Sequence, residues 1–497
     1  MPATTDRNRF LHSLSAKECQ LNSRLSLRGC EEIGISLYAV IEHVGALSWD
    51  EGPLASNLGA VMEGHDASME TAAAPRMKSP DRSQIDPNPK RIDDLIPRDH
   101  PARLVWELVQ GLDLTPLYAR IKAVAGHAGR PPIDPRILVA LWLYATEEGV
   151  AEARELCRRC YDCDPYKWLR GGVDVNYHTL SDFRTQHPAW LKQQVVANIA
   201  TLRAEGLASL GVLGQDGMRV RAHAGNDSFR RADALGKLLE EAERKWDCLQ
   251  QEFEQETKRS AREQAAQQRA VRERIERLKQ AQEEVQKVAQ AREKRKKGDG
   301  DSARASTTDP EARRMKMGDG GTRPAYNVEF STDLKSLVIM GCDVTNAGTD
   351  AGQLEPMTQK IEAEQGPLPD NAEGYVDGGF VTREDLQSMA KRGVTVYAPL
   401  KAVEKHQQQG KDPYAPRRGD SPEVVQWRQR MATEAGQQKY KQRAKCEWSN
   451  AQCRNRGLQQ FVVRGLAKVK TVVLWYVWVH NLFRMVALRA QRASAAA

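Results

Sequence analysis

Apolar residues at helical spacing predict an all-α region between residues 90 and 205. Its first helix is marked by apolar residues that recur at helix-like intervals: Leu104, Val105, Leu108, Leu112 and Leu114. Asp134 and Pro135 open a second helix, as its N-cap and its first-turn residue. Helical spacing continues over 152–163, and Ser181 is predicted to cap a further helix. Short helices with arginines and aromatic residues between them are typical of a DNA-binding module, although a bundle that only packs on another domain has the same pattern.

Short segments with strand character follow, and they predict a mixed sheet. These segments are residues 210–222, 326–331, 337–344, 373–376 and 394–397. We expect the first to contain a strand and its hairpin return, and the second and third to pair as another hairpin. A helix that begins at Thr382 separates the last two strands. This order predicts a mixed α+β domain formed by residues 206–231 and 309–492.

The stretch between these two parts, residues 232–308, is predicted to be a coiled-coil insertion. Two runs have the 3- and 4-residue steps of heptads: Leu235, Leu239, Ala242, Trp246, Leu249 and Phe253, then Val271, Ile275, Leu278, Gln282, Val285 and Ala289. The apolar positions lapse between Glu254 and Gln268, so we expect two helical arms, either folded back on each other or joined as one long helix. By composition, residues 298–308 are a flexible linker.

The two ends of the chain have different compositions. Residues 1–89 are rich in Ser, Ala, Gly and Asn and contain no motif, which predicts a disordered or loosely helical extension, with Met77 as an alternative start. Residues 471–479 are strongly apolar, but the run is too short to span a bilayer and predicts a buried helix. Residues 493–497 are expected to form a disordered tail.

Charge and cysteine content narrow the class of protein. The 497 residues carry a net charge of +8, with 74 Lys and Arg against 66 Asp and Glu. This surplus favours a polyanionic partner, although it is modest for so long a chain. Nine cysteines in an irregular pattern, with no signal peptide at the start, favour the cytoplasm. Cys157, Cys160 and Cys163 have the spacing of a zinc half-site, but no second pair follows, so free thiols on a helix are expected.

The candidate chemistry centres on the segment from Tyr440 to Glu447. It sets Tyr440, Arg443 and Glu447 at i, i+3 and i+7, which share one face of an α-helix. A carboxylate backed by a guanidinium can enter a metal site while the arginine reaches a phosphate. Two further carboxylates, Asp216 and Asp377, each follow a strand-like run and precede a glycine, which lets a backbone or a phosphate approach.

With these residues the chain resembles the DDE transposases of bacterial insertion sequences, in the branch with a Tyr-x2-Arg-x3-Glu signature. The resemblance covers about residue 90 to the C-terminus. It extends to five more segments: Asp309 to Arg313, Tyr326 to Val328, Val344 to Asn346, Gln353 to Met357, and His480 to Arg484. The resemblance implies an RNase H-like catalytic domain with Asp216, Asp377 and Glu447 as its catalytic residues. We expect His480 and Asn481 to be structural.

Three carboxylates brought together repel one another unless cations neutralise them. Hard oxygen ligands select Mg²⁺ or Mn²⁺, and two ions are expected in this site. One ion would activate a water or 3′-hydroxyl, and the other would stabilise the leaving oxygen of an in-line displacement at phosphorus. Arg443 would bind a phosphate near the scissile bond. Tyr440 would stack on or hydrogen-bond to the DNA strand, or else only pack on the helix.

The resemblance predicts an enzyme that cleaves DNA at the ends of an insertion sequence and transfers those ends to a target. Its partners would be double-stranded DNA, from the terminal repeats and the target, and further copies of the chain. It would work in the bacterial cytoplasm, at the nucleoid. Two alternatives remain open: a catalytically inactive DNA-binding or assembly protein derived from a transposase, and a plain metal-dependent DNA nuclease.

Overall fold

The computed structural model describes residues 90–496 except 122, 124–130 and 256–259. The predictions for residues 1–89 lie outside these residues. Contacts divide the chain into a unit that ends at Leu108 and a unit from Val109 onward. In the first unit, the 3-10 helix η1 (Ile92–Leu95) precedes α3 (Pro101–Gln110), which runs across the boundary. The Arg103 guanidinium ties them together, donating to Asp93 Oδ1 at 2.9 Å and to the Ile96 carbonyl at 3.2 Å.

The second unit begins with the short helices that the sequence predicts. They are α4 (Thr115–Tyr118), α5 (Pro135–Glu147), α6 (Ala153–Asp162), α7 (Asp164–Arg170), α8 (Tyr177–Gln186) and α9 (Pro188–Ala204). Asp134 caps α5 as predicted, accepting from the Arg136 N–H at 2.8 Å. The predicted cap at Ser181 is wrong, because Asn176 caps α8 and Ser181 lies within that helix. The three cysteines of α6 and its end are free, and Cys160 is buried.

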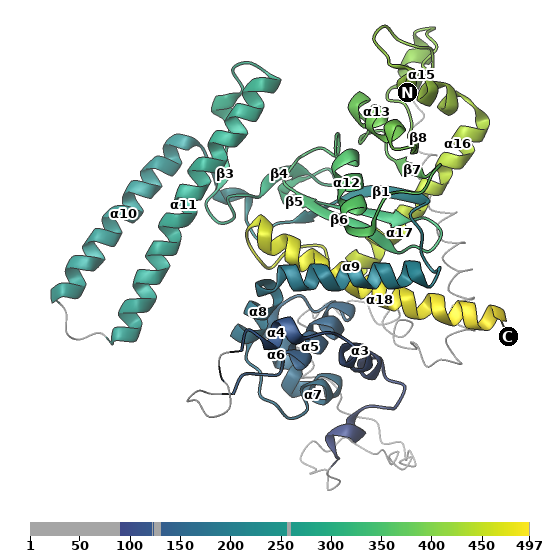
Figure 1. The fold of residues 1–497 in the computed structure, drawn as a ribbon. Coiled ribbons are helices and arrows are strands. Elements are labelled where there is room, and N and C mark those ends of the chain that lie inside the picture. The colour runs from purple at the N-terminus through teal and green to yellow at the C-terminus, as the bar shows by residue number, and fades with distance from the viewer. Residues whose placement is uncertain (1–89, 122, 124–130, 256–259, 497) are drawn as a thin grey trace, which may run out of the picture. The chain divides into compact units, whose positions relative to one another are not determined.

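A mixed sheet forms the centre of the second unit (Figure 1). Its strands are β1 (Val212–Arg221), β4 (Arg313–Lys316), β5 (Thr322–Asp333), β6 (Ile339–Thr345), β7 (Glu373–Val376) and β8 (Thr395–Tyr397). Their order is β4-β5-β1-β7-β8, and β6 also pairs with β5. β1 is antiparallel to β5 and parallel to β7, which is parallel to β8. The mixed α+β prediction is therefore confirmed, including the β5–β6 hairpin.

One prediction about β1 is wrong: the chain does not turn back at Asp216. β1 is a single strand of 10 residues, and Gly217 pairs with Glu329 of β5 like its neighbours. The glycines of β1 serve close packing instead. A Cβ at Gly214 would overlap Cys446 Sγ and lie 2.6 Å from Leu334 Cδ2, and a Cβ at Gly217 would lie 2.9 Å from Asp350 Oδ1.

Helices cover the sheet. After β6 come α12 (Leu354–Gln365), α13 (Arg383–Lys391), α14 (Val403–Gln408), α15 (Pro422–Ala432), α16 (Glu434–Tyr440), the 3-10 helix η4 (Lys441–Lys445), α17 (Cys446–Asn455) and α18 (Leu466–Ala496). α18 packs along α9 and against β6, and α17 packs against β1 (Figure 1). A core cluster joins β7 and β8 to α13, α15 and α17, and includes Tyr375, Trp427 and Cys446. Thr382 starts α13 with a capping box that involves Asp385, as the sequence indicates.

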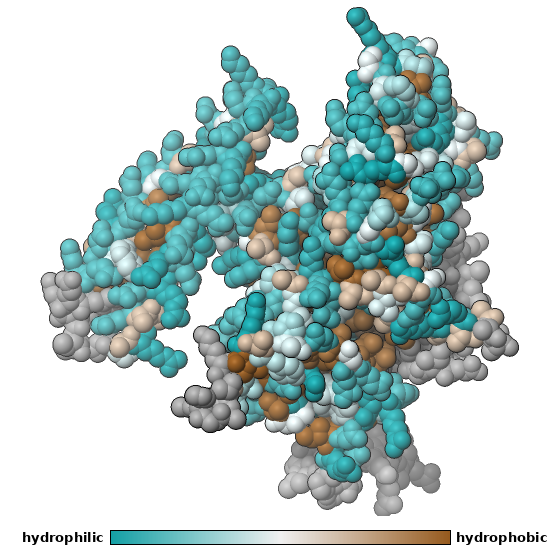
Figure 2. Space-filling view, in the orientation of Figure 1, coloured by the Kyte–Doolittle hydropathy of each residue, from teal (hydrophilic) through white to brown (hydrophobic). Residues whose placement is uncertain are grey.

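The insertion consists of two helices that fold back on each other. They are α10 (Ala232–Gln255) and α11 (Ala261–Arg295), and the buried cluster between them includes Leu235, Ala242, Leu278, Ala281 and Val285. Figure 2 shows that the outer surface of this helical hairpin is mainly hydrophilic. Knobs-into-holes packing of coiled-coil type remains a prediction.

The base of the hairpin is closed by a small two-stranded sheet. The 3-10 helix η2 (Asn226–Ser228) leads into β2 (Phe229–Arg230), and η3 (Gly300–Ser302) leads into β3 (Ala305–Ser306). β2 and β3 pair antiparallel, with Phe229 opposite Ser306. Ala305 and Ser306 are fully buried. The expectation of a flexible linker over residues 298–308 is therefore wrong.

The apolar run near the C-terminus belongs to a longer helix than the sequence indicates. α18 continues through Ala496, so it includes most of the expected tail at 493–497. Among the described residues, Leu466–Ala495 is the one helix long and apolar enough to cross a membrane by length and composition alone, yet 67% of its apolar window is buried within the protein. The predicted buried helix is confirmed at residues such as Trp475 and Val479, which are 2% exposed or less.

Candidate active site

The strand register brings Asp216 and Asp377 to neighbouring positions. β1 and β7 are parallel, and their pairing runs from Val212 opposite Glu373 to Gln215 opposite Val376. Asp216 is the next residue of β1, and Asp377 directly follows the last residue of β7. Adjacent strands lie about 4.8 Å apart, and residues opposite each other in a parallel pair project from the same face. The two aspartates therefore each follow the last paired residues, Gln215 and Val376, at the carboxyl end of the parallel pair.

The glycine after Asp377, Gly378, allows the close backbone approach that the sequence indicates. A Cβ at Gly378 would lie 2.7 Å from the Pro399 carbonyl oxygen, so the backbone of the chain after β8 approaches closely there. The N–H of Gly378 also donates to Asp377 Oδ1 at 2.7 Å. The Asp377 side chain is exposed. It is therefore accessible to a ligand while its strand is fixed from both sides.

The segment from Tyr440 to Glu447 is not one regular α-helix, so the prediction of a single α-helical face is wrong. The chain passes from α16 through the 3-10 turn η4 into α17. Tyr440 and Cys446 both contact the same core cluster. In an α-helix they would lie about 120° apart around the axis, whereas steps of about 120° per residue in a 3-10 turn nearly align them. Packing of these two residues on the core therefore accounts for the tighter turn.

Arg443 contacts two of the three predicted carboxylates. Its Nη2 donates to Asp216 Oδ1 at 2.7 Å, and its Nη1 lies 3.5 Å from Glu447 Oε1. The Arg443 and Asp216 side chains are 17% and 16% exposed, whereas the Glu447 side chain is 66% exposed. Tyr440 is half-buried against the core. Arg443 therefore contacts both Asp216 and Glu447, and Asp377 follows β7, the strand next to β1.

Asn450 is a site residue that the sequence reasoning missed. Its Nδ2 donates to Asp216 Oδ2 at 2.8 Å, so both oxygens of Asp216 accept a hydrogen bond from the α16–η4–α17 segment. Asn450 is 6% exposed, and its Oδ1 is buried without a hydrogen-bond partner in the described part of the chain. Its position three residues after Glu447, on the same side of α17, was the signal that could have identified it.

Burial makes Asp216 depend on neighbouring cations. Desolvation raises the pKa of Asp216 above its ordinary value, although the nearby Arg443 acts in the opposite direction. An ionised carboxylate at this depth needs a positive partner, which is Arg443 here. The possible metal ligands around this position are carboxylate oxygens, which hard divalent cations prefer. Asp216, Asp377 and Glu447 therefore suit such a cation chemically. Among the described residues, however, no group of three Asp, Glu, His or Cys side chains lies close enough together to form a metal site.

A second polar network lies on the opposite face of β1. Gln215 Nε2 donates to Glu329 Oε2 at 2.8 Å and to the Gln353 carbonyl at 3.1 Å. Asn327 donates to Glu329 Oε1 at 3.1 Å and to Asp350 Oδ1 at 2.6 Å. Glu329 is 1% exposed, and burial raises its pKa to about 8. These residues connect β1 and β5 to the start of α12, so they support the strand that carries Asp216.

The other segments that carry the resemblance hold the fold together. Asp309 accepts from the Tyr326 hydroxyl at 2.7 Å and from the Gly465 N–H at 3.2 Å. Glu311 accepts from the Leu466 N–H at 2.8 Å, at the start of α18. The Asp309–Arg313 segment thus connects β5 to α18, away from the three carboxylates. The sequence alone did not distinguish this structural role from a catalytic one.

His480 and Asn481 connect α18 to the β5–β6 hairpin. Asn481 Oδ1 accepts from the Ile339 N–H at 2.9 Å, and its Nδ2 donates to the Ile339 carbonyl at 2.8 Å. His480 Nε2 lies 2.9 Å from the Leu337 carbonyl oxygen, at a residue whose φ is 62°. Burial lowers the pKa of His480 to about 4. Both residues therefore have the structural role that the sequence reasoning expected.

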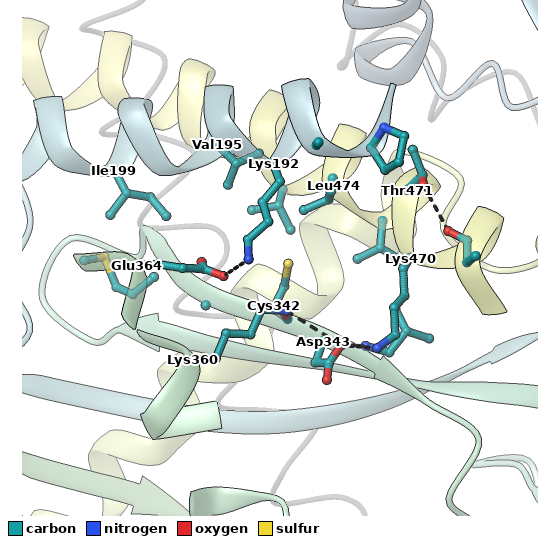
Figure 3. Close-up of a pocket in the computed structure, with 18 residues that line it drawn as sticks. Lys192, Val195, Ile199, Cys342, Asp343, Lys360, Glu364, Lys470, Thr471 and Leu474 are labelled. Carbon is teal, nitrogen blue, oxygen red and sulfur yellow. Dashed lines mark hydrogen bonds and ion pairs between the residues drawn. The ribbon is translucent and has the colours of Figure 1, made fainter. Parts of the chain in front are cut away.

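A pocket of about 350 Å³ lies between α9, β6, α12 and α18 (Figure 3). Its wall is apolar, with residues such as Val195, Ile199 and Leu474. Two ion pairs lie at its side, Lys192 with Glu364 at 2.8 Å and Lys470 with Asp343 at 2.9 Å. None of the predicted site residues lines this pocket. We therefore place the candidate active site at Asp216 and its neighbours.

Comparison with known families identifies two matched domains in the chain. Residues 90–186 match a family described as a transposase domain (DUF772), and residues 418–486 match a transposase DDE domain. These two matches support a DDE transposase of insertion-sequence type. The second match contains Arg443, Glu447 and Asn450, and the first contains the short helices α4–α8. No curated protein and no solved structure matches this transposase.

The two matched domains imply a general partner for the chain. Transposases act on DNA, so DNA is the partner that the two matched domains imply. The excess of basic residues agrees with this partner. Asp216 and Asp377 lie between the two matched segments. Arg443 and Asn450, which lie in the DDE match, both donate hydrogen bonds to Asp216.

Proposed function

We propose that this transposase cleaves DNA at the ends of its insertion sequence and transfers the freed ends to target DNA. The observation that carries the proposal is the contact of Arg443 with both Asp216 and Glu447, with Asp377 directly after β7, the strand parallel to β1. These are the residues that the DDE resemblance designates. We also assign the mixed sheet and its helices to an RNase H-like catalytic domain.

Asp216, Asp377 and Glu447 are the proposed ligands of two Mg²⁺ or Mn²⁺ ions. When bound, such ions activate the attacking oxygen and stabilise the leaving oxygen in a phosphoryl transfer. Asp216 is suited to this role because its carboxylate is desolvated and fixed by two donors, so it is oriented before any ligand arrives. Glu447 is more exposed and depends on its helix for position.

Arg443 is proposed to bind a phosphate of the DNA strand. A guanidinium presents a planar fork of donors that matches a phosphate, and Arg443 Nε is buried without a hydrogen-bond partner among the described residues. Arg443→Lys keeps the charge and loses the fork, so cleavage should fall sharply while end binding changes little. If lysine supports near-normal cleavage, Arg443 only holds the carboxylates in place. We assign Tyr440 to the same strand contact, by stacking or a hydrogen bond, and α4–α8 to recognition of the DNA ends.

The direct test uses purified transposase, a labelled DNA end of the element and Mg²⁺. The proposal predicts cleavage at one defined phosphodiester, followed by joining of the 3′-hydroxyl end to a target plasmid. Asp216→Asn provides the control for contaminating nucleases. Cleavage without joining, even from a pre-cut end, would identify a nuclease. Binding without cleavage would identify an assembly protein.

A further inference from the structure

We propose that Arg443 makes metal binding at the carboxylate site depend on DNA. In this proposal, which rests on the function proposed above, the guanidinium holds Asp216 and Glu447 until a DNA phosphate draws it away. Arg443 is then a specificity-determining residue as well as a phosphate ligand. The transposase would load metal ions efficiently only when a DNA strand is in the site.

The contacts of Arg443 carry the first step. Its two Nη atoms reach Asp216 Oδ1 at 2.7 Å and Glu447 Oε1 at 3.5 Å, so one cation serves two of the three proposed metal ligands. A divalent ion would need the same Oδ1 lone pairs and would be repelled by the guanidinium beside it. Metal and Arg443 therefore compete for Asp216. The low exposure of both side chains strengthens this competition, because little water screens it.

The second step is that a phosphate offers Arg443 a better position. Arg443 Nε is buried and makes no hydrogen bond among the residues described, so the guanidinium uses only part of its donor set. A phosphate accepts two parallel N–H bonds from the fork. An open groove lined by Gln438, Lys441, Gln442 and Lys445 flanks Arg443 along the chain. Lys439 also lines this groove and pairs with Glu373, whereas Lys441 and Lys445 are exposed and have no ion pair within the described residues, which suits a DNA backbone.

The third step is that Asp216 keeps its position when Arg443 leaves. Asn450 holds the other oxygen, Oδ2, at 2.8 Å, from a side chain that is 94% buried. Loss of Arg443 therefore frees Oδ1 without releasing the carboxylate. By linkage, a DNA that raises metal affinity must itself bind more tightly when the metal is present, by the same factor.

The test is calorimetric titration of Mn²⁺ into the transposase, with and without DNA. The DNA is a duplex of the element's terminus, which flanks the coding sequence, and it is already cut at its 3′ end. For the wild type we expect the duplex to lower the Mn²⁺ dissociation constant by about 5-fold or more, the usual range of such coupling. Arg443→Gln should bind Mn²⁺ tightly without DNA, with less than about 2-fold further effect of the duplex. Arg262→Gln, an equal charge change at an exposed position of α11, should behave like the wild type without DNA.

Two comparisons make the outcome decisive. If Asp216→Asn abolishes Mn²⁺ binding but Arg443→Gln binds no more tightly than the wild type, the coupling proposal is overturned and the metal site stands. If Mn²⁺ binding survives in Asp216→Asn, the carboxylate site proposed above is itself wrong. Should Arg443→Gln fail to fold by circular dichroism, Arg443→Lys replaces it. Lysine cannot span both carboxylates, so an unchanged Mn²⁺ affinity and an unchanged DNA effect in that variant would equally overturn the proposal.

Discussion

The two halves of the candidate site are built in different ways. Asp216 lies within β1, where it pairs with Phe330 of β5, and Asp377 directly follows the last paired residue of β7. Glu447 lies on a helix that follows a 3-10 turn, and its side chain is 66% exposed. Side-chain contacts from Arg443 and Asn450 connect the two halves. The comparison indicates that the strand half is fixed by the backbone, whereas the helical half is held by a few polar side chains and by packing.

Removing any of the three carboxylates should have the largest effect, whichever half it belongs to. Asp216→Asn, Asp377→Asn and Glu447→Gln should each lower the cleavage rate by about 10³-fold or more, because each removes a charged metal ligand worth several kcal/mol of transition-state stabilisation. Cleavage is measured on a labelled end, and end binding by gel shift should persist. Normal cleavage by one variant would exclude that residue from the site.

The contact between the halves can be broken by a single methyl group. Gly214→Ala places a Cβ against Cys446 Sγ and Leu334, so β1 and α17 must move apart. We expect the free energy of unfolding to fall by about 1–3 kcal/mol. Denaturant unfolding measures it. Gly211→Ala is the matched control, because its Cβ has only Ser209 Oγ nearby, at 3.9 Å. Equal stability of the two variants would show that α17 does not pack on Gly214 as described.

The lysines beside the helical half should contribute to DNA affinity through charge alone. Replacing Lys441 and Lys445 together by Gln should weaken DNA binding at low salt and reduce the slope of log affinity against log salt by about 1.8, or about 0.9 for each phosphate contact. Fluorescence anisotropy at several salt concentrations gives the slope. An unchanged slope would mean that the backbone does not follow this groove. Melting temperature should be unaffected, since both side chains are exposed.

The smallest effect is expected from the N-terminal extension. The matched transposase domain begins at residue 90. A chain that starts at Met77 should therefore cleave DNA ends at a rate within about 2-fold of the full chain, a difference of less than ~0.5 kcal/mol in the barrier. Complete loss of cleavage in a folded protein of this length would assign a function to the first 76 residues.

Sequence reasoning located most elements because their periodicity and their end signals agreed. β7 begins at Glu373 and ends at Val376 as expected, and Asp134 and Thr382 cap the predicted helices. The errors arose where long-range packing decided the local structure. The Gly217 position suggested a turn but reflects the approach of Asp350. The α-helical spacing of Tyr440, Arg443 and Glu447 could not show the 3-10 turn, because Tyr440 and Cys446 tighten it only when the core is present.

In the candidate site too, local signals could be predicted from the sequence and long-range packing could not. Asp216, Asp377 and Glu447 were found from local motifs. The parallel pairing of β1 with β7 relates the two aspartates, whereas the packing of α17 on β1 and the contacts of Arg443 relate Glu447 to Asp216. Asn450 was missed because its contact with Asp216 depends on how α17 crosses β1. Its position on the same side of α17 as Glu447 marked it as a candidate, but the sequence could not show that it would contact Asp216.

The closure of the α10–α11 hairpin by β2 and β3 has an evolutionary consequence. Phe229 faces Ser306 and Arg230 faces Ala305, so the chain leaves and re-enters the transposase at nearly the same point. A segment whose ends meet in this way can be lengthened, shortened or exchanged without altering the register of β1 with β5. The hairpin is therefore a module that natural variation can change independently of the strand that carries Asp216. Related elements could differ widely in the length of this arm while conserving the order of their three carboxylates.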